Sequence, residues 1–372
     1  MSCKILRILP LMALAAILSG CKMTVLNPSG DVAAQQRDLI IASTVLMLVI
    51  IVPVIVLTLF FAWRYRASNS KAKYDPEWSH STTLEVVIWA APLTIIVALG
   101  ALTWVSTHLL DPYRPLARID ANTPVQDEVR PLEVDVVALD WKWLFIYPEQ
   151  GIATINEMAA PVDAPINFRL TSSTMMNSFA IPALAGQVYA MPGMVTKLHA
   201  VINQPGVYDG FSANYSGAGF SDMNFKFHGL SQGDFNRWVA EAKAAGGRLG
   251  RQEYLKLAEP SVKEPVRRFG SIDPGLYQAV IERCVEPDKM CMSEMARIDA
   301  QGGAGMAGTL NVVASRVRQG GVAQRGQVGQ EVERRYVLAF CTLDQPYGDQ
   351  PYGASATEPA GAPRPSSPGT TE

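Results

Sequence analysis

Two long stretches without a charged residue decide what this chain of 372 residues can fold into. The first covers residues 39–63 and the second covers residues 86–105. A helix needs about 20 apolar residues to cross a bilayer, and each stretch is long enough. Pro53 and Pro92 interrupt them, which is costly in a soluble helix but tolerated in a membrane helix. The sequence therefore predicts a transmembrane hairpin rather than two buried core helices.

A third apolar block lies at the amino terminus and is too short to span a bilayer. Lys4 and Arg7 precede the apolar residues 8–18, a pattern typical of a secretory signal peptide over residues 1–20. The block ends in Leu-Ser-Gly followed by Cys21, which resembles a bacterial lipobox. That resemblance implies cleavage before Cys21 and lipidation of its thiol, with palmitate as the expected acyl group. The alternative is an ordinary signal peptide followed by an incidental cysteine.

The orientation of the hairpin follows from its flanking charges. Arg64, Arg66, Lys71 and Lys73 come directly after the first stretch, and such a cluster marks the cytoplasmic side of a membrane. A lipidated Cys21 would lie on the outer side, which gives the same topology. The part of the chain after about residue 110 is then extracytoplasmic. The net charge of −2 gives no reason to expect a nucleic-acid partner.

The exported part begins with short strand-like segments. Residues 131–228 are rich in alternating Val, Trp, Phe and Tyr and are broken by Pro and Gly. Several short strands at close spacing predict an antiparallel sandwich of about 100 residues.

Helices are expected after the sandwich. Ser231 and Asp234 form a capping-box pattern before an apolar face with helical spacing, namely Phe235, Trp238, Val239 and Ala242. Gly246 is a suitable stop, and shorter helices are expected near 251–258 and 274–284. From residue 301 Gly, Gln and Arg become frequent, and the end is rich in Pro, Gly, Ser and Thr. Such a tail cannot bury a core and is predicted to be disordered.

Several motifs resemble one family. They are FAWRYRAS, KYDPEWSHSTTLEVVIWAAPL, DWKWLFIYPEQGIATINE, MMNSFAIPALAGQVYAMPGM and YDGFSANYSGAGFSDMNFKF. Together they resemble subunit II of the haem–copper oxidases, in particular of the cytochrome bo-type ubiquinol oxidases, over about residues 18–260.

The resemblance implies a two-span transmembrane α-hairpin followed by an all-β cupredoxin-like sandwich. It fades beyond residue 260, and the short helices and the disordered tail expected after the sandwich rest on the sequence pattern alone. The expected parts are a signal peptide (1–20), a lipidated amino end with the hairpin (21–110), the sandwich (111–228), a helical extension (229–300) and the tail (301–372).

Copper-bearing members of this family have Cys-x-Glu-x-Cys-x3-His-x2-Met in the last loop of the sandwich and a histidine upstream. Soft sulfur and imidazole ligands of this kind favour a copper pair. The resemblance places the former ligand positions here at Asn177, Tyr215, Gly217, Gly219, Met223 and Lys226. One thioether among such neighbours cannot hold a copper pair. We therefore expect no catalytic residue, metal or cofactor in this chain.

Loss of the copper centre implies a different electron donor. The copper centre of relatives accepts electrons from cytochrome c, so this chain is expected to have no cytochrome c partner. Ubiquinol would instead deliver electrons to a large catalytic subunit I that carries the haems and the remaining copper. Smaller subunits III and IV and membrane lipid are the other expected partners, in a proton-pumping complex of the bacterial inner membrane, with the sandwich in the periplasm. The alternatives are a copper-containing cytochrome c oxidase subunit and a free-standing envelope lipoprotein.

Glu85 is the one candidate for proton chemistry. It stands just before the second uncharged stretch, on the cytoplasmic side. In the family a glutamate in this motif lies at the mouth of a proton path into the large subunit. An ionisable residue at a membrane span is a functional candidate. The alternative is a solvated acid that stabilises the start of a helix through its dipole.

Other chemically suggestive residues have simpler structural readings. Trp141 and Trp143 resemble the aromatic cluster near the donor site of copper-bearing relatives, but packing is the better interpretation without copper. Cys284 and Cys291 are close enough to pair in an oxidising compartment, which leaves Cys341 over. Nearby methionines also allow copper binding, although a disulfide is simpler. No two histidines have metal-ligand spacing; they are His80, His108, His199 and His228.

Overall fold

The structure is a computed structural model, and it describes residues 23–73, 75–126, 129–287 and 289–301. The predicted signal peptide, the predicted lipidation site Cys21 and the predicted tail, apart from Gln301, lie outside the described residues.

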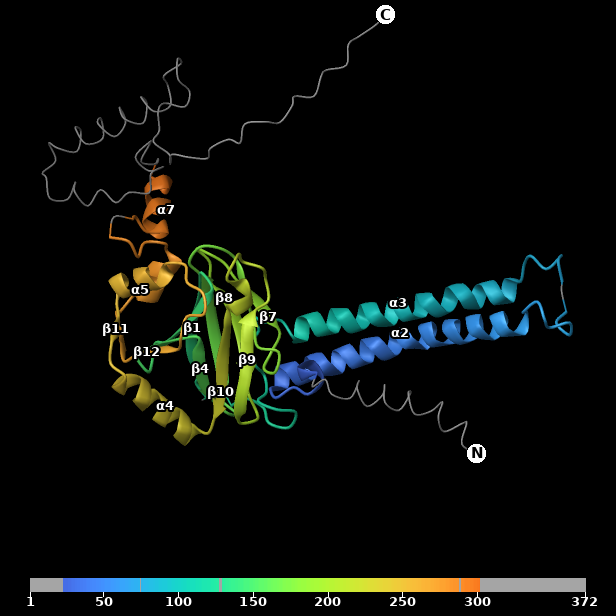
Figure 1. Cartoon of the computed structure of the whole chain (residues 1–372), viewed down its shortest axis with the longest axis horizontal. Helices are drawn as coiled ribbons and strands as arrows, with labels where there is room; N and C mark the ends of the chain where they lie inside the picture. Colours follow the sequence, from blue (N-terminus) through green and yellow to red (C-terminus); the bar gives the residue numbers. More distant parts are fainter. Residues whose placement is uncertain (1–22, 74, 127–128, 288, 302–372) are drawn as a thin grey trace, which may run out of the picture. The chain divides into compact units, whose positions relative to one another are not determined.

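Two long helices follow the short 3-10 helix η1 (Thr24–Leu26). They are α2 (Asp31–Arg64) and α3 (Thr82–Leu109). At about 1.5 Å per residue, their 34 and 28 residues give lengths of about 51 and 42 Å, beyond the roughly 30 Å of a bilayer core. They lie side by side with their apolar side chains exposed (Figure 1). Each is long and apolar enough to cross a membrane.

The start of α2 is fixed to the sandwich by its backbone. The amides of Ser29 and Gly30 both donate to the carbonyl of Ala183, at 2.9 Å each. A Cβ added at Gly30 would lie 2.4 Å from the carbonyl oxygen of Val201, so only glycine allows this approach. Asp31, which is 7% exposed, then pairs with Arg118 at 2.8 Å. The hairpin therefore joins the next domain through specific contacts.

Two sheets face each other in the sandwich (Figure 1). The first has the order β12-β3-β2-β1-β5-β8 and the second has the order β4-β10-β9-β6-β7. The strands are β1 (Leu132–Leu139), β2 (Lys142–Tyr147), β3 (Ile152–Ile155), β4 (Glu157–Pro161), β5 (Pro165–Ser172), β6 (Asn177–Ala180), β7 (Gln187–Ala190), β8 (Thr196–Val201), β9 (Gly206–Ser212), β10 (Asn224–Leu230) and β12 (Arg267–Phe269).

The prediction of a purely antiparallel sandwich is wrong. β1 pairs with β5 in parallel, and β4 pairs with β10 in parallel, while the other pairs are antiparallel. The chain crosses from the first sheet to the second between β3 and β4 and returns at β5. A strand that changes sheets in this way pairs with a partner far along the chain, and local alternation does not encode that direction.

Aromatic rings fill the space between the sheets. Trp143 lies with its ring centroid 5.3 Å from that of Phe179, and Phe179 stacks on Phe225 at 5.3 Å. Trp143 and Phe179 are 0% exposed, and Phe225 is 3% exposed. Paired rings of this kind stabilise by about 0.5–1.5 kcal/mol beyond their buried area. Trp143 is therefore a packing residue, as the sequence indicated.

Helix α4 (Gln232–Ala244) begins as the sequence predicts. The hydroxyl oxygen of Ser231 accepts a hydrogen bond from the amide of Asp234 at 3.2 Å, which caps the helix. Phe235, Trp238 and Ala242 are buried along one face and pack against the core between the sheets. The helix ends before Gly246, whose φ of 74° lies in the left-handed region.

Residues 229–300 contain the short helices that the sequence predicts, and also strands that it did not predict. Besides α5 (Arg251–Ala258) and α6 (Leu276–Ile281), the segment contains three short strands. β12 joins the first sheet by pairing with β3, while β11 (Arg248–Leu249) pairs with β13 (Ser271–Ile272). A second core covers the outer face of the first sheet, where Leu144, Ile146 and Ile155 meet side chains of α5 and α6. Helix α7 (Met292–Ala300) ends the described part.

Candidate functional site

The loop that resembles a copper site lies at one end of the sandwich, between β9 and β10. The structure does not gather the positions that the resemblance assigned as former ligands. Asn177 and Met223 are each 1% exposed, but Tyr215 is 76% exposed. The side chain of Lys226 is 59% exposed and pairs with Asp209 on the neighbouring strand. Tyr215 and Lys226 therefore point away from Asn177 and Met223.

Trp141 occupies the space beside the two loop glycines. A Cβ added at Gly219 would lie 2.4 Å from Cδ2 of Trp141, and one added at Gly217 would lie 3.1 Å from Cζ2. The indole Nε1 of Trp141 donates to the carbonyl of Ser216 at 3.0 Å. Trp141 has a φ of 65°, an unfavourable backbone conformation for a bulky residue. The contacts with the loop stabilise Trp141 in this conformation. No cysteine fits at Gly219 unless this indole moves.

Ser212 and Ser216 are two buried polar residues at this end of the sandwich. Ser212 is 4% exposed and Ser216 is 5% exposed. The hydroxyl of Ser212 donates to Oδ1 of Asn177 at 3.3 Å, and its amide donates to the carbonyl of Met223 at 3.1 Å. The hydroxyl of Ser216 is buried without a hydrogen-bond partner within the part of the chain that the structure describes. An orphaned hydroxyl is costly, whereas a thiol at the same place would lose little.

The donors at this end of the sandwich do not fit a copper pair. They are an amide, two hydroxyls and the thioether of Met223, and no thiolate or imidazole lies among them within the described residues. Copper pairs need soft thiolate and imidazole ligands. The sequence analysis did not single out Ser212 and Ser216, because the resemblance assigned the former ligand positions to other residues of this loop. Their spacing, two small polar residues four apart with Met223 seven further on, was the available signal.

Glu85 lies in the first turn of α3, with Ser81 as the N-cap. Its side chain is 50% exposed, and its Oε1 lies 2.6 Å from Nδ1 of His80. The other ring nitrogen of His80 lies 3.1 Å from the hydroxyl of Thr82. A carboxylate and an imidazole in contact can exchange a proton between them. The sequence analysis treated His80 as structural and missed this contact.

Another imidazole–carboxylate pair lies on the neighbouring strands β4 and β10. Oε1 of Glu157 is 3.3 Å from Nε2 of His228, and Arg268 binds both carboxylate oxygens at 2.9 and 3.1 Å. Burial alone raises the pKa of Glu157, but the hydrogen bonds from His228 and Arg268 outweigh it and lower the pKa to about 2. Arg268 also bonds to Glu241 on α4 at 3.3 Å. This cluster joins the two sheets to α4 and has a structural role.

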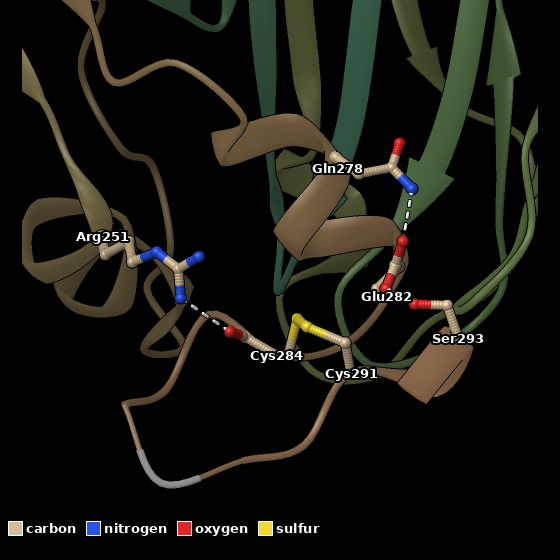
Figure 2. The surroundings of a disulfide bond; sticks show 6 residues. All are labelled: Arg251, Gln278, Glu282, Cys284, Cys291 and Ser293. Carbon is tan, nitrogen blue, oxygen red and sulfur yellow. Dashed lines mark hydrogen bonds between the residues drawn. A yellow bond between two sulfur atoms is a disulfide. The ribbon is translucent and has the colours of Figure 1, made fainter. Parts of the chain in front are cut away.

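Cys284 and Cys291 form a disulfide at the end of α6 (Figure 2). Cys284 is 2% exposed, and its carbonyl accepts a hydrogen bond from Nη1 of Arg251 at 2.9 Å. Glu282 beside the bridge accepts hydrogen bonds from Ser293 and Gln278, which lower its pKa. Sulfurs in a disulfide are not thiolates, so the Cys284–Cys291 bond cross-links the chain and does not bind copper.

Comparisons with known proteins agree with this architecture. A family model described as "Cytochrome C oxidase subunit II, periplasmic domain" matches residues 131–229, and one described as "COX Aromatic Rich Motif" matches residues 243–288. The second match extends past residue 260, where the resemblance was expected to fade.

The chain is similar to three curated proteins over most of its length. It is 51% identical to "Cytochrome bo(3) ubiquinol oxidase subunit 2" of Pseudomonas putida over 74% of this chain and 85% of that protein. The protein of the same name from Pseudomonas aeruginosa is 52% identical over 73% of this chain and 80% of its own length. "Ubiquinol oxidase subunit 2" of Acetobacter aceti is 49% identical over 72% of this chain and 85% of that protein.

Proposed function

The chain belongs to the family of subunit II of the ubiquinol oxidases, and from this premise we propose that it serves its complex without a redox centre of its own. It is a membrane-anchored subunit of an oxidoreductase complex, with a periplasmic cupredoxin-like domain. The observation that carries the proposal is the donor set at the end of the sandwich, which cannot hold a copper pair.

The copper motif aligns with this chain three residues earlier than the resemblance first suggested. In this register Ser212 and Ser216 stand at the two cysteine positions, Asn214 at the glutamate and Phe220 at the histidine, while Met223 stands at the methionine itself. The support is burial, because Ser212, Ser216 and Met223 are buried like Asn177, and Ser212 bonds to Asn177 directly. Tyr215 and Lys226 face solvent instead. Asn177 stands at the upstream histidine in both registers.

Electrons reach the complex without passing through this chain. Ubiquinol donates to a large catalytic subunit I that carries the haems and copper, and cytochrome c is not a donor. The exposed apolar faces of α2 and α3 pack against that subunit, and smaller subunits III and IV complete the assembly. The support is the family membership together with a donor set that offers no electron entry point.

Glu85 passes protons from the cytoplasm toward the catalytic subunit, with His80 as its partner. The support is their 2.6 Å contact at the start of α3, next to the basic segment that follows α2. Both groups are half-exposed, so water reaches the carboxylate directly.

The chain is made with a signal peptide and is lipidated at Cys21, in the bacterial inner membrane. The lipobox pattern and the Arg64–Lys73 cluster support this topology. Reporter tags near residues 75 and 360 should lie on the cytoplasmic and periplasmic sides respectively. Both tags on one side would rule the hairpin out.

The proposal is tested by the electron donor of the intact complex. The complex is purified through this chain, and its oxygen consumption is measured with ubiquinol and with reduced cytochrome c. We expect turnover with ubiquinol alone and haem absorption bands in the co-purified subunits. Turnover supported by cytochrome c, with copper bound to this chain, would favour the copper-containing alternative.

A further inference from the structure

A cavity of about 460 Å³ lies where the two long helices meet the sandwich, and the function proposed above does not use it. Its wall is formed by the first two turns of α2 and by residues 109–112 and 114–118 at the end of α3 and after it. Gly186, Gln187, Leu198 and His199 of the sandwich complete the wall. Small-molecule sites in proteins have volumes of about 300–1,000 Å³. The cavity is therefore large enough to hold a polar headgroup.

The cavity lies at the level of the membrane surface. The lining residues Asp31–Gln36 come three to eight residues before Leu39, where the uncharged part of α2 begins. At about 1.5 Å per residue, they lie roughly 4–12 Å outside the apolar span. The polar layer on each side of a bilayer is about 5–8 Å thick. Leu109, which is 56% exposed, lines the cavity at the end of α3 next to the apolar span.

Two arginines give the cavity its phosphate-binding chemistry. Arg118 donates to the Asp31 carboxylate through Nε and Nη2, at 2.8 and 3.1 Å. The N–H groups of Nη1 are not used in this pair and can donate to a ligand. Arg114 is exposed, donates through Nη1 to the carbonyl of His108 at 3.3 Å, and has no carboxylate partner within the described residues. Planar guanidinium groups bind phosphate oxygens in pairs.

The cavity is close to neutral as a whole. Asp31 and Asp111 balance the two arginines, and burial together with the nearby Lys197 lowers the pKa of His199, which keeps its ring neutral at pH 7. Asp111 lies at the rim, where its Oδ1 accepts a hydrogen bond from the amide of Tyr113 at 2.9 Å. A balanced lining favours a group that carries both charges over a free phosphate ion.

We propose that this cavity binds the headgroup of a zwitterionic membrane phospholipid, with its phosphate on Arg114 and Arg118 and its amine next to Asp111. The apolar lining at the end of α3 then meets the glycerol and the first carbons of the acyl chains. Such a lipid would seal the place where the hairpin leaves the membrane.

Native mass spectrometry of the full chain in detergent tests the proposal. The chain is stripped of lipid and then titrated with phosphatidylethanolamine or with inorganic phosphate. We expect one tightly held phosphatidylethanolamine per chain, and Arg114→Gln should weaken it at least about tenfold because a charge-assisted hydrogen bond is lost. Arg130→Gln, which removes an exposed charge on the same side of the membrane, is the control and should bind like the unaltered chain.

Two results would overturn the proposal. One is equal lipid binding by Arg114→Gln and Arg130→Gln, and the other is displacement of the lipid by inorganic phosphate, which would identify a free anion as the ligand. A second measurement needs no variant. Phosphatidylethanolamine should slow the chemical modification of Arg114 by phenylglyoxal relative to that of Arg130, as read by peptide mapping. Equal protection of the two arginines would also contradict a lipid in this cavity.

Discussion

Replacement of Glu85 by glutamine separates a proton-conducting role from a structural one. Glutamine keeps the size of the side chain and its ability to accept a hydrogen bond from His80, but it cannot carry a proton. If protons enter through this carboxylate, Glu85→Gln and Glu85→Ala should lose most of the oxygen-reduction rate. Glu85→Asp should keep most of it, because the ionisable group remains.

The structural cost of the change is small. A carboxylate in the first turn of a helix contributes about 0.3–1 kcal/mol through the helix dipole. The Glu85–His80 pair is half-exposed, and exposed pairs contribute about 0.2–1 kcal/mol. The sum stays below about 2 kcal/mol, against a typical stability of about 5–15 kcal/mol. Assembly and haem content should therefore be unchanged, and a fall in rate cannot come from unfolding.

The assay is ubiquinol-dependent oxygen consumption per haem in the purified complex. Glu77→Gln is the matched control, because Glu77 is an exposed acid in the same segment, and it should run at the full rate. A full rate in Glu85→Gln as well would refute the reasoning and leave Glu85 as a solvated acid at the start of a helix.

Two further predictions concern the sandwich. Arg268→Ala should lower the free energy of unfolding by about 2–3 kcal/mol, because the Glu157 carboxylate stays buried without its arginine partner. This is less than the roughly 3–5 kcal/mol for a fully buried pair, since the Arg268 side chain is partly exposed, and urea titration followed by tryptophan fluorescence should show it. The folded pKa of Glu157, about 2, lies below its ordinary value, so its stabilisation is complete above about pH 4.5 and is lost as the pH falls toward 2. The loss on acidification should be smaller in Arg268→Ala, and an equal loss in both proteins would show that Arg268 does not lower this pKa. The second prediction is that a restored ligand set should bind a copper pair and give a purple spectrum, with Met223 unchanged and the substitutions Asn177→His, Ser212→Cys, Asn214→Glu, Ser216→Cys and Phe220→His. The set in the other register consists of Asn177→His, Tyr215→Cys, Gly217→Glu, Gly219→Cys, Met223→His and Lys226→Met. This set should bind no copper, because a side chain at Gly219 collides with Trp141. Equal copper binding by both sets would contradict the proposed register.

Features that depend on neighbours along the chain were predictable from the sequence. The two helices follow from charge-free apolar stretches, and they extend beyond those stretches because polar residues form their terminal turns. The cap at Ser231 and the buried face of α4 follow from residues three and four apart. These signals are local, so no knowledge of the tertiary fold is needed to read them.

Pairings between distant strands were not predictable. β12 pairs with β3 over a separation of more than a hundred residues, and the parallel direction of β4 and β10 depends on where the chain crosses between sheets. Residues such as Arg267 and Arg268 give no alternating apolar pattern, because they lie on an edge strand and are half-exposed. The segment was therefore expected to be part of a helical extension.

The register of the copper-like loop is hard to predict from the sequence for a different reason. A loop has no repeating period that indicates which side chains point inward. When the metal ligands are absent, the sequence alone therefore does not fix how the motif aligns with the loop. Burial separates the two registers, because it distinguishes Ser216 from its neighbour Tyr215. The contact between His80 and Glu85 was equally hidden, since it depends on how the segment before α3 turns.

The proposal that this chain holds no redox metal is tested most directly by metal analysis of the full chain. The chain is separated from its partner subunits, incubated with copper and then washed with a chelator. We predict far less than one copper per chain and no purple absorption, while the variant with cysteines at positions 212 and 216 and the other restored ligands retains copper under the same treatment. Two copper ions held by the unaltered chain after the wash would contradict the account.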